Sequence, residues 1–191
     1  MFTRRRFLQT LGALAVPHAL HAQSHPFSLG VASGYPTPTG VTLWTRLASA
    51  LAPTRVRWEL ATDEAMRSIA RSGETLTQAE WAHSVHVDVQ DLEPARWYWY
   101  RFTADGAQSR VGRTRTAPAA GSDPGRLRFA FASCQQYEQG YYNAYRHLVA
   151  DEPDLVAFLG DYIYESSWGK DHVRSHGAPE PYSLEDRKSV V

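Results

Sequence analysis

The first half of the chain alternates apolar and polar residues in short runs, a pattern typical of β-strands that bury one face. The runs occupy residues 27–33, 41–46, 56–61, 68–71, 83–89, 97–104 and 109–116. Turn-forming pairs such as Asp105-Gly106 separate them. Roughly seven strands of this length predict a small β-sandwich over residues 25–117. Within this first half of the chain, only residues 62–66 suggest a helical turn.

A tyrosine motif narrows the type of sandwich. Leu92, Pro94 and Tyr98 have the spacing of a tyrosine corner, in which the tyrosine hydroxyl bonds to the backbone near the start of a strand. This motif favours a fibronectin type III-like sandwich. Within residues 97–104 the period of two puts Tyr98, Tyr100 and Phe102 on one face and Trp97, Trp99 and Arg101 on the other. We expect one face to be core and the other to lie at a domain junction or a ligand surface.

The second half of the chain has a different pattern. Residues 118–125 are rich in Pro, Gly and Ala, which predicts a linker. An apolar strand at 127–133, a helix at 141–150 and a second apolar strand at 155–160 follow, and together they predict a βαβ unit. Residues 126–191 are therefore expected to begin an α/β domain.

Side chains that can bind a metal follow both apolar strands of this unit. Cys134 ends the first strand, and Asp161 and Tyr164 follow the second. Because parallel strands bring their carboxyl ends to one edge of a sheet, we expect these three side chains to converge. The spacing alone is equally consistent with a buried lone cysteine and an ordinary Gly-Asp turn. His172 and His176 have a spacing that binds metal on a helix, but no helical pattern surrounds them, and we expect solvated loop histidines.

Composition and charge exclude some classes of protein. A content of 43% hydrophobic and 21% charged residues is that of a globular protein. The formal net charge is zero and would be negative without Arg4, Arg5 and Arg6. The chain therefore lacks the basic excess that nucleic-acid binding requires, and we expect no nucleic-acid partner.

The N-terminus has the layout of an export signal. Arg4, Arg5 and Arg6 precede a mildly apolar run and then small residues. The run is shorter than the ~20 apolar residues of a membrane span and contains Pro17 and His18, so we expect no stable membrane anchor. Residues 1–22 resemble a twin-arginine signal. That resemblance implies a periplasmic or secreted protein that uses the twin-arginine export machinery.

Several motifs, in order along the chain, resemble the alkaline phosphatase D (PhoD) family. They include Gly30-Val31-Ala32-Ser33-Gly34, Leu43-Trp44-Thr45-Arg46, Ala132-Ser133-Cys134-Gln135 and Gly160-Asp161-Tyr162-Ile163-Tyr164-Glu165. The resemblance implies a metallophosphoesterase domain with Fe³⁺ held by a thiolate, a tyrosinate and an aspartate, and Ca²⁺ beside it. In this sequence those ligands are Cys134, Tyr164 and Asp161, with Asp161 bridging the metals and serving catalysis. The implied activity is hydrolysis of phosphate mono- or diesters, as phosphodiesterase and alkaline phosphatase.

Two alternatives and two further expectations remain. Purple acid phosphatases pair a β-sandwich with a similar Gly-Asp-x-x-Tyr motif, but their first ligand strand ends in Asp-x-Gly, whereas here it ends in Ser133-Cys134. Alternatively, the sandwich acts only as a binding module. The PhoD family takes further metal ligands from later strands, so we expect a truncated N-terminal part of the enzyme, inactive by itself. Residues 186–191 match the translation of a common sequencing adapter and are expected to be foreign to the gene.

Overall fold

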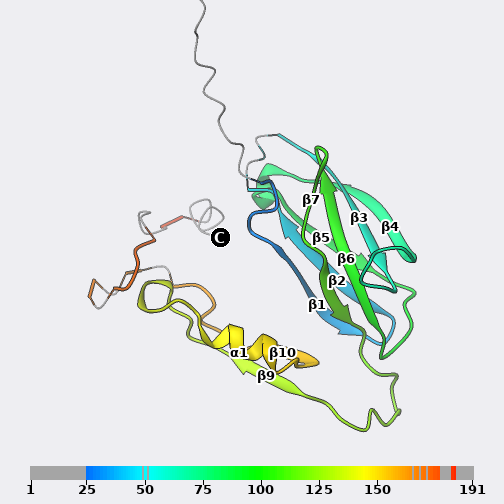
Figure 1. The fold of residues 1–191 in the computed structure, drawn as a ribbon. Helices are drawn as coiled ribbons and strands as arrows, with labels where there is room; N and C mark the ends of the chain where they lie inside the picture. The colour runs from blue at the N-terminus through cyan, green and yellow to red at the C-terminus, as the bar shows by residue number, and fades with distance from the viewer. Residues whose placement is uncertain are drawn as a thin grey trace, which may run out of the picture.

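The computed structural model describes residues 25–48, 50, 52–164, 166–167, 169–170, 172–176 and 182–183. The expected export signal at 1–22 and the expected adapter-derived residues 186–191 lie outside these ranges. Figure 1 shows a two-sheet β-sandwich and, beside it, a smaller βαβ unit. Among the described residues, no helix is both long enough and apolar enough to cross a membrane.

Two antiparallel sheets form the sandwich. The first has the strand order β1 (Val31–Thr37), β2 (Gly40–Arg46) and β5 (Ser84–Val89), with the short 3-10 helix η1 (Ala79–Trp81) before β5. The second has the order β4 (Ile69–Leu76), β3 (Arg55–Ala61), β6 (Trp97–Ala104) and β7 (Ala107–Gln108), and β8 (Gly112–Arg115) also pairs with β6. The predicted run at 109–116 thus contains one strand, β8, and the short strand β7 lies directly before it.

The alternation in the sequence matches the core of the sandwich. Along β6, Tyr98, Tyr100 and Phe102 are buried, while the residues between them are half-buried. They belong to the same core cluster as Leu43 of the facing sheet. The Tyr98 hydroxyl accepts a hydrogen bond of 2.9 Å from the backbone N–H of Glu93, so the tyrosine corner is formed.

Two local predictions were wrong. The strand expected at 27–33 begins only at Val31, because Phe27 lies in a turn and reaches the core from there. The helical turn expected at 62–66 is a turn without helix. There the Asp63 carboxylate accepts hydrogen bonds from the backbone N–H groups of Arg67 and Ser68, and this local bonding competes with helix formation.

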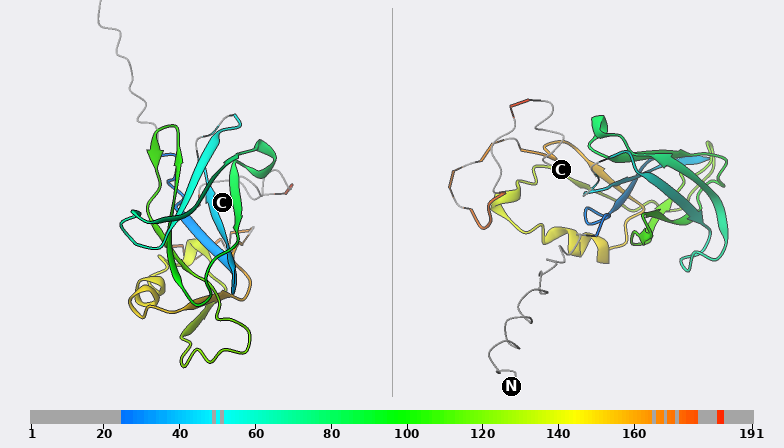
Figure 2. Two further views of the ribbon diagram at one scale, coloured as in Figure 1. Left: turned by 90° about the vertical axis from the view of Figure 1, so that its right-hand side faces the viewer. Right: turned by 90° about the horizontal axis from the view of Figure 1, so that it is seen from above.

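The smaller unit is a βαβ arrangement with parallel strands. Its elements are β9 (Phe129–Ala132), the 3-10 helix η2 (Tyr137–Gln139), α1 (Ala144–Ala150) and β10 (Leu155–Phe158). Strands β9 and β10 pair in parallel, with Leu155 opposite Phe129 and Phe158 opposite Ala132. The two views in Figure 2 place this unit beside the sandwich, and its sheet is separate from the sandwich sheets.

Basic side chains of β8 join the two parts. Arg115 forms an ion pair with Asp154, directly before β10, and Arg113 lies 3.8 Å from Glu152. Arg113 also stacks on the ring of Trp97, 4.4 Å from its centroid. The outer face of β6 at Trp97 therefore lies at the junction with the second unit, one of the two expected uses of that face.

Candidate metal centre

The ends of the two parallel strands bring the candidate ligands together. Strand β9 ends at Ala132, two residues before Cys134, and β10 ends at Phe158, three residues before Asp161. The register sets Phe158 opposite Ala132, and the backbone N–H of Leu159 donates to the Ala132 carbonyl at 2.9 Å. The segments after β9 and β10 therefore leave the sheet at the same edge, as the sequence predicts.

Sharp backbone turns follow both strands. Cys134 has a φ of 55° and Asp161 a φ of 48°, both in the left-handed region that non-glycine residues rarely adopt. Gly160, between β10 and Asp161, has a φ of 119°, which lies outside the region open to L-residues. Such conformations are unfavourable and persist only where the surrounding structure holds them, and they cluster at functional sites.

The three side chains meet at one carboxylate oxygen. The Cys134 thiol donates to Oδ2 of Asp161 at 3.6 Å, and the Tyr164 hydroxyl donates to the same oxygen at 3.1 Å. Donor atoms that share one metal at bond lengths of 2.0–2.3 Å are separated by roughly 3.0–3.6 Å. The observed separations are of that size, so modest side-chain rotation would let a single ion contact all three.

The electrostatics of the cluster suit a cation. Desolvation, and then the neighbouring Cys134 and Asp161, raise the pKa of Tyr164 to about 12. Without a metal the phenol therefore stays protonated and donates a hydrogen bond to Asp161. Three groups that become anionic when they ligate would repel one another at these distances, and a multivalent cation removes that repulsion. The donor set thus fits a metal, with a soft thiolate and hard carboxylate and phenolate oxygens.

Among the described residues, the candidate site is accessible to solvent. Cys134 and Asp161 are exposed, and Tyr164 is half-buried. Among the described residues, no group of three or more His, Cys, Asp and Glu side chains has an arrangement that could hold a metal ion. The candidate centre therefore depends on the phenol as its third donor.

Comparison with known proteins identifies the family. A family model for the N-terminal domain of PhoD-like phosphatases matches residues 13–118, and one for the PhoD-like phosphatase itself matches residues 129–189. This chain belongs to the PhoD-like phosphatase family. All three candidate ligands of the PhoD-like chain lie within the second match.

Relatives of the PhoD-like chain are longer than it is. Alkaline phosphatase D of Bacillus subtilis (strain 168) is 44% identical over 196 residues, covering 95% of this chain and 33% of that protein. A solved structure entitled "Structure of PhoD" superposes with a TM-score of 0.83 at 44% identity, covering 87% of this chain and 34% of that one. A human fibronectin type III domain overlaps with a TM-score of only 0.36 at 21% identity, over 49% of this chain and 87% of the domain. The PhoD-like chain thus spans about a third of the length of its PhoD relatives.

A carboxylate that the sequence analysis missed lies in the loop after Cys134 of the PhoD-like chain. Glu138 in η2 is 2% exposed and accepts a 2.7 Å hydrogen bond from the Ser167 hydroxyl. The ring Nε2 atoms of His172 and His176 lie 3.2 and 3.6 Å from its two oxygens. Both histidines are exposed loop residues, as predicted, but the sequence analysis did not foresee that they contact a buried carboxylate.

This cluster has its own electrostatics. The hydrogen bond from Ser167, and after it the nearby His172 and His176, lower the pKa of the Glu138 carboxyl against the opposing effect of burial. Glu138 therefore stays anionic in a buried position. In the sequence it is one polar residue among several after Cys134, and only its partners, 29 to 38 residues later, distinguish it.

Proposed function

We propose that this chain is part of an exported phosphoric ester hydrolase of the alkaline phosphatase D type, with Cys134, Asp161 and Tyr164 among the ligands of its metal centre. One observation carries the proposal. In a chain of the PhoD-like family, a thiol, a carboxylate and a phenol from two strand ends converge on one oxygen atom. The βαβ unit is then the beginning of the metallophosphoesterase domain.

The proposed metals are Fe³⁺ and Ca²⁺, which would stabilise charge on a phosphate ester and activate a water for attack on phosphorus. Cys134 and Tyr164 would supply a thiolate and a phenolate to the iron. Asp161, whose Oδ2 already accepts from both neighbours, is suited to bridge two ions through its two oxygens. The same residue would act in catalysis through the metals that it holds.

Metal binding is tested by visible spectroscopy with Tyr164→Phe. Iron bound to a phenolate gives a charge-transfer band, which should appear when Fe³⁺ is added to the product of the complete gene and be lost in its Tyr164→Phe variant. The matched control is Tyr162→Phe, because Tyr162 is 58% exposed and contacts the ring of Phe158 rather than Asp161. Because a Cys134 thiolate on the same iron would absorb as well, the decisive result is a spectrum that is unchanged in Tyr164→Phe, or a band that never forms in the wild type, and either would refute the assignment of this ligand.

Activity is a proposal for the whole protein, since this chain spans about a third of its relatives. The substrates to compare are p-nitrophenyl phosphate and bis-p-nitrophenyl phosphate, a monoester and a diester. We expect the product of the complete gene to hydrolyse at least one of them and Asp161→Asn to lose that activity. If the iron-loaded protein hydrolyses neither ester, the phosphatase proposal fails.

Export is proposed from the N-terminal segment alone. Arg4 and Arg5 would be the paired arginines of a twin-arginine signal that sends the protein to the periplasm or outside the cell. Residues 1–24 fused to a reporter that is exported only when folded should carry it out of the cytoplasm. The double variant Arg4→Lys, Arg5→Lys should retain the reporter, and export of this variant would argue against the twin-arginine route.

The alternative of a sugar- or ligand-binding sandwich has less support. Its aromatic face was the basis for that reading, but Arg113 and Arg115 lie over the ring of Trp97, with their guanidinium carbons 4.4 and 5.4 Å from its centroid. Arg101 of the same face is paired with Glu59. The purple acid phosphatase alternative is disfavoured by membership of the PhoD-like family.

A further inference from the structure

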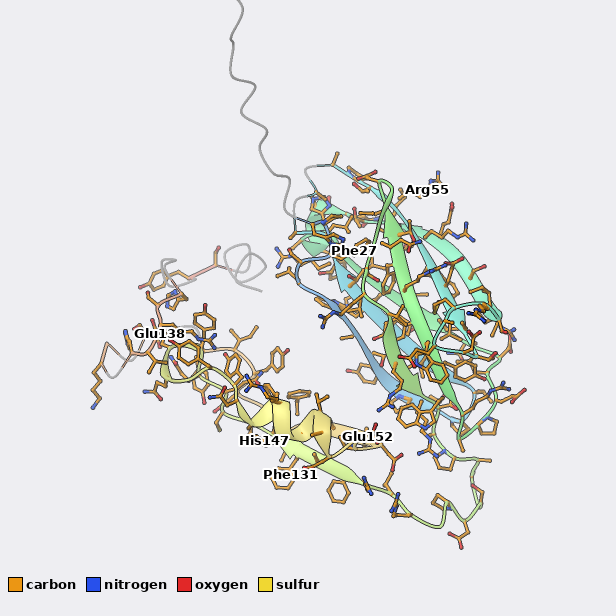
Figure 3. The ribbon with its side chains drawn as sticks, viewed as in Figure 1. Phe27, Arg55, Phe131, Glu138, His147 and Glu152 are labelled. Carbon is orange, nitrogen blue, oxygen red and sulfur yellow. The ribbon has the colours of Figure 1, made fainter. Side chains whose placement is uncertain are left out.

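Polar contacts are prominent in the described part of the βαβ unit. Among the described residues after Thr116, Glu138 is the single buried one. By contrast, Phe131 of β9 is 67% exposed, and Figure 3 shows it on the side of the strand turned away from the sandwich. Hydrogen bonds and ion pairs among the described residues are therefore candidates for the contacts that fix the loops beside the candidate metal centre.

Glu138 connects the two loops that carry the candidate ligands. It lies four residues after Cys134, and its partner Ser167 lies three residues after Tyr164. The 2.7 Å hydrogen bond from Ser167 to Oε2 of Glu138 thus ties the loop after β10 to the loop after β9. The Gln136 side chain holds Glu138 in place by accepting from its backbone N–H at 2.6 Å.

A second layer of contacts fastens residues 172–176 onto the same 3-10 helix. The backbone carbonyl of Glu138 accepts from the N–H groups of Val173 at 2.8 Å and Arg174 at 3.4 Å. The Arg174 guanidinium lies 3.7 Å from the ring centroid of Tyr137 and donates to its carbonyl. The Tyr141 hydroxyl donates to the Val173 carbonyl at 2.8 Å. The side chain and the backbone carbonyl of Glu138 thus both contact the segment that contains residues 167–176.

The charge of Glu138 suits it to this role. The Ser167 hydroxyl donates to one of its oxygens, and the Nε2 atoms of His172 and His176 lie 3.2 and 3.6 Å from its oxygens, so three side chains from one loop converge on one buried carboxylate. Hydrogen bonds to a charged acceptor are stronger than those to a neutral one. A glutamine at position 138 would keep one acceptor oxygen but no charge, and an alanine would keep no side-chain acceptor.

We propose that Glu138 is a positioning residue for the metal centre, which holds the loop of Asp161 and Tyr164 against the Cys134 loop so that the three ligands stay together. The proposal rests on the proposed function, since it assigns a support to that centre. Glu138 is not itself assigned as a ligand. Residues that orient metal ligands from behind usually contribute 10- to 100-fold to metal affinity.

The test compares Glu138→Ala and Glu138→Gln with Glu152→Gln in the full chain. Glu152 is a suitable control because it belongs to the same unit, its side chain is 69% exposed, and its 3.8 Å contact is with Arg113 of the sandwich. Two quantities are measured: Fe³⁺ affinity, by titration of the charge-transfer band, and hydrogen exchange of residues 160–176 in the metal-free protein. The exchange measurement does not depend on metal or activity.

We expect Glu138→Ala to bind Fe³⁺ roughly 10- to 100-fold more weakly and to exchange the amides of residues 160–176 faster. Glu138→Gln should show a smaller change in the same direction, which keeps the test decisive if the alanine variant fails to fold. Glu152→Gln should match the wild type. Faster exchange with unchanged iron affinity would overturn the positioning role, and so would unchanged exchange in both Glu138 variants. A product of the complete gene that binds no iron would refute the proposed function and the positioning role with it.

Discussion

Replacing Gly160 by alanine tests whether the backbone turn before Asp161 sets the candidate site. A Cβ at this position would meet no atom within 4 Å, so the substitution causes no steric clash. The φ of 119° is the obstacle, because an L-residue held there costs about 1–3 kcal/mol. The matched control is Gly140→Ala, since Gly140 also has open space around it but an extended φ of −169°.

The strain can be released only by moving the backbone next to Asp161. If the loop shifts to relieve it, the lost free energy appears as weaker metal binding, about 5- to 150-fold at about 1.4 kcal/mol for each factor of ten. If the loop does not shift, the same 1–3 kcal/mol appears as lower stability. We expect Gly160→Ala to show one or both losses, in an Fe³⁺ titration and in urea unfolding. Gly140→Ala should be neutral or slightly stabilising, by up to about 1 kcal/mol. Wild-type affinity and urea midpoint in Gly160→Ala would refute the reasoning.

Three further predictions concern the sandwich. Tyr98→Phe removes the acceptor for the N–H of Glu93 and should lower the free energy of unfolding by about 1–2 kcal/mol in urea, and no change would deny the tyrosine corner a stabilising role. Gly112→Ala would put a Cβ 2.4 Å from Cζ of the buried Tyr100 ring and should cost about 1–3 kcal/mol, a cost that Tyr100→Ala should remove in a double-mutant cycle. Burial raises the pKa of Tyr100 from 10.0 to about 12, so its neutral form is favoured in the folded state. The contribution of this group to the free energy of unfolding is fully present well below pH 10 and should fall by about 2 kcal/mol as the pH rises from 10 to 12. Tyr100→Phe should lack this part of the pH dependence, and an equal loss in that variant would contradict the assignment.

The sandwich was predictable because its signal is local and periodic. Along residues 97–104 every second side chain is buried, and hydrophobic alternation alone indicates which ones. The two errors occurred where another interaction replaces that rule. Phe27 fills the core from a turn, so an apolar residue was taken for the start of a strand. Asp63 bonds to the backbone of the residues that follow it, which the apolar pattern does not encode.

The convergence of the candidate ligands was also predictable, for a topological reason. Once residues 127–160 are read as βαβ, the parallel pairing forces Cys134 and Asp161 to the same edge. The backbone conformations there were not predictable. Non-glycine residues in the left-handed region carry no sequence signal of their own, and Cys134 and Asp161 adopt it where the chain leaves the sheet. The roles of these residues as metal ligands stay a proposal.

The contacts of Glu138 explain why sequence reasoning stopped short of the rest of the site. Its three side-chain partners come from a loop without periodic pattern, so neither helix nor strand rules place them. Among the described residues of this unit, these polar contacts join the two strained turns to each other. A site built this way depends on a few hydrogen bonds, each removable by one substitution. Affinity for metal should therefore respond more to Glu138 and Gly160 than to conservative changes at exposed apolar residues such as Phe131.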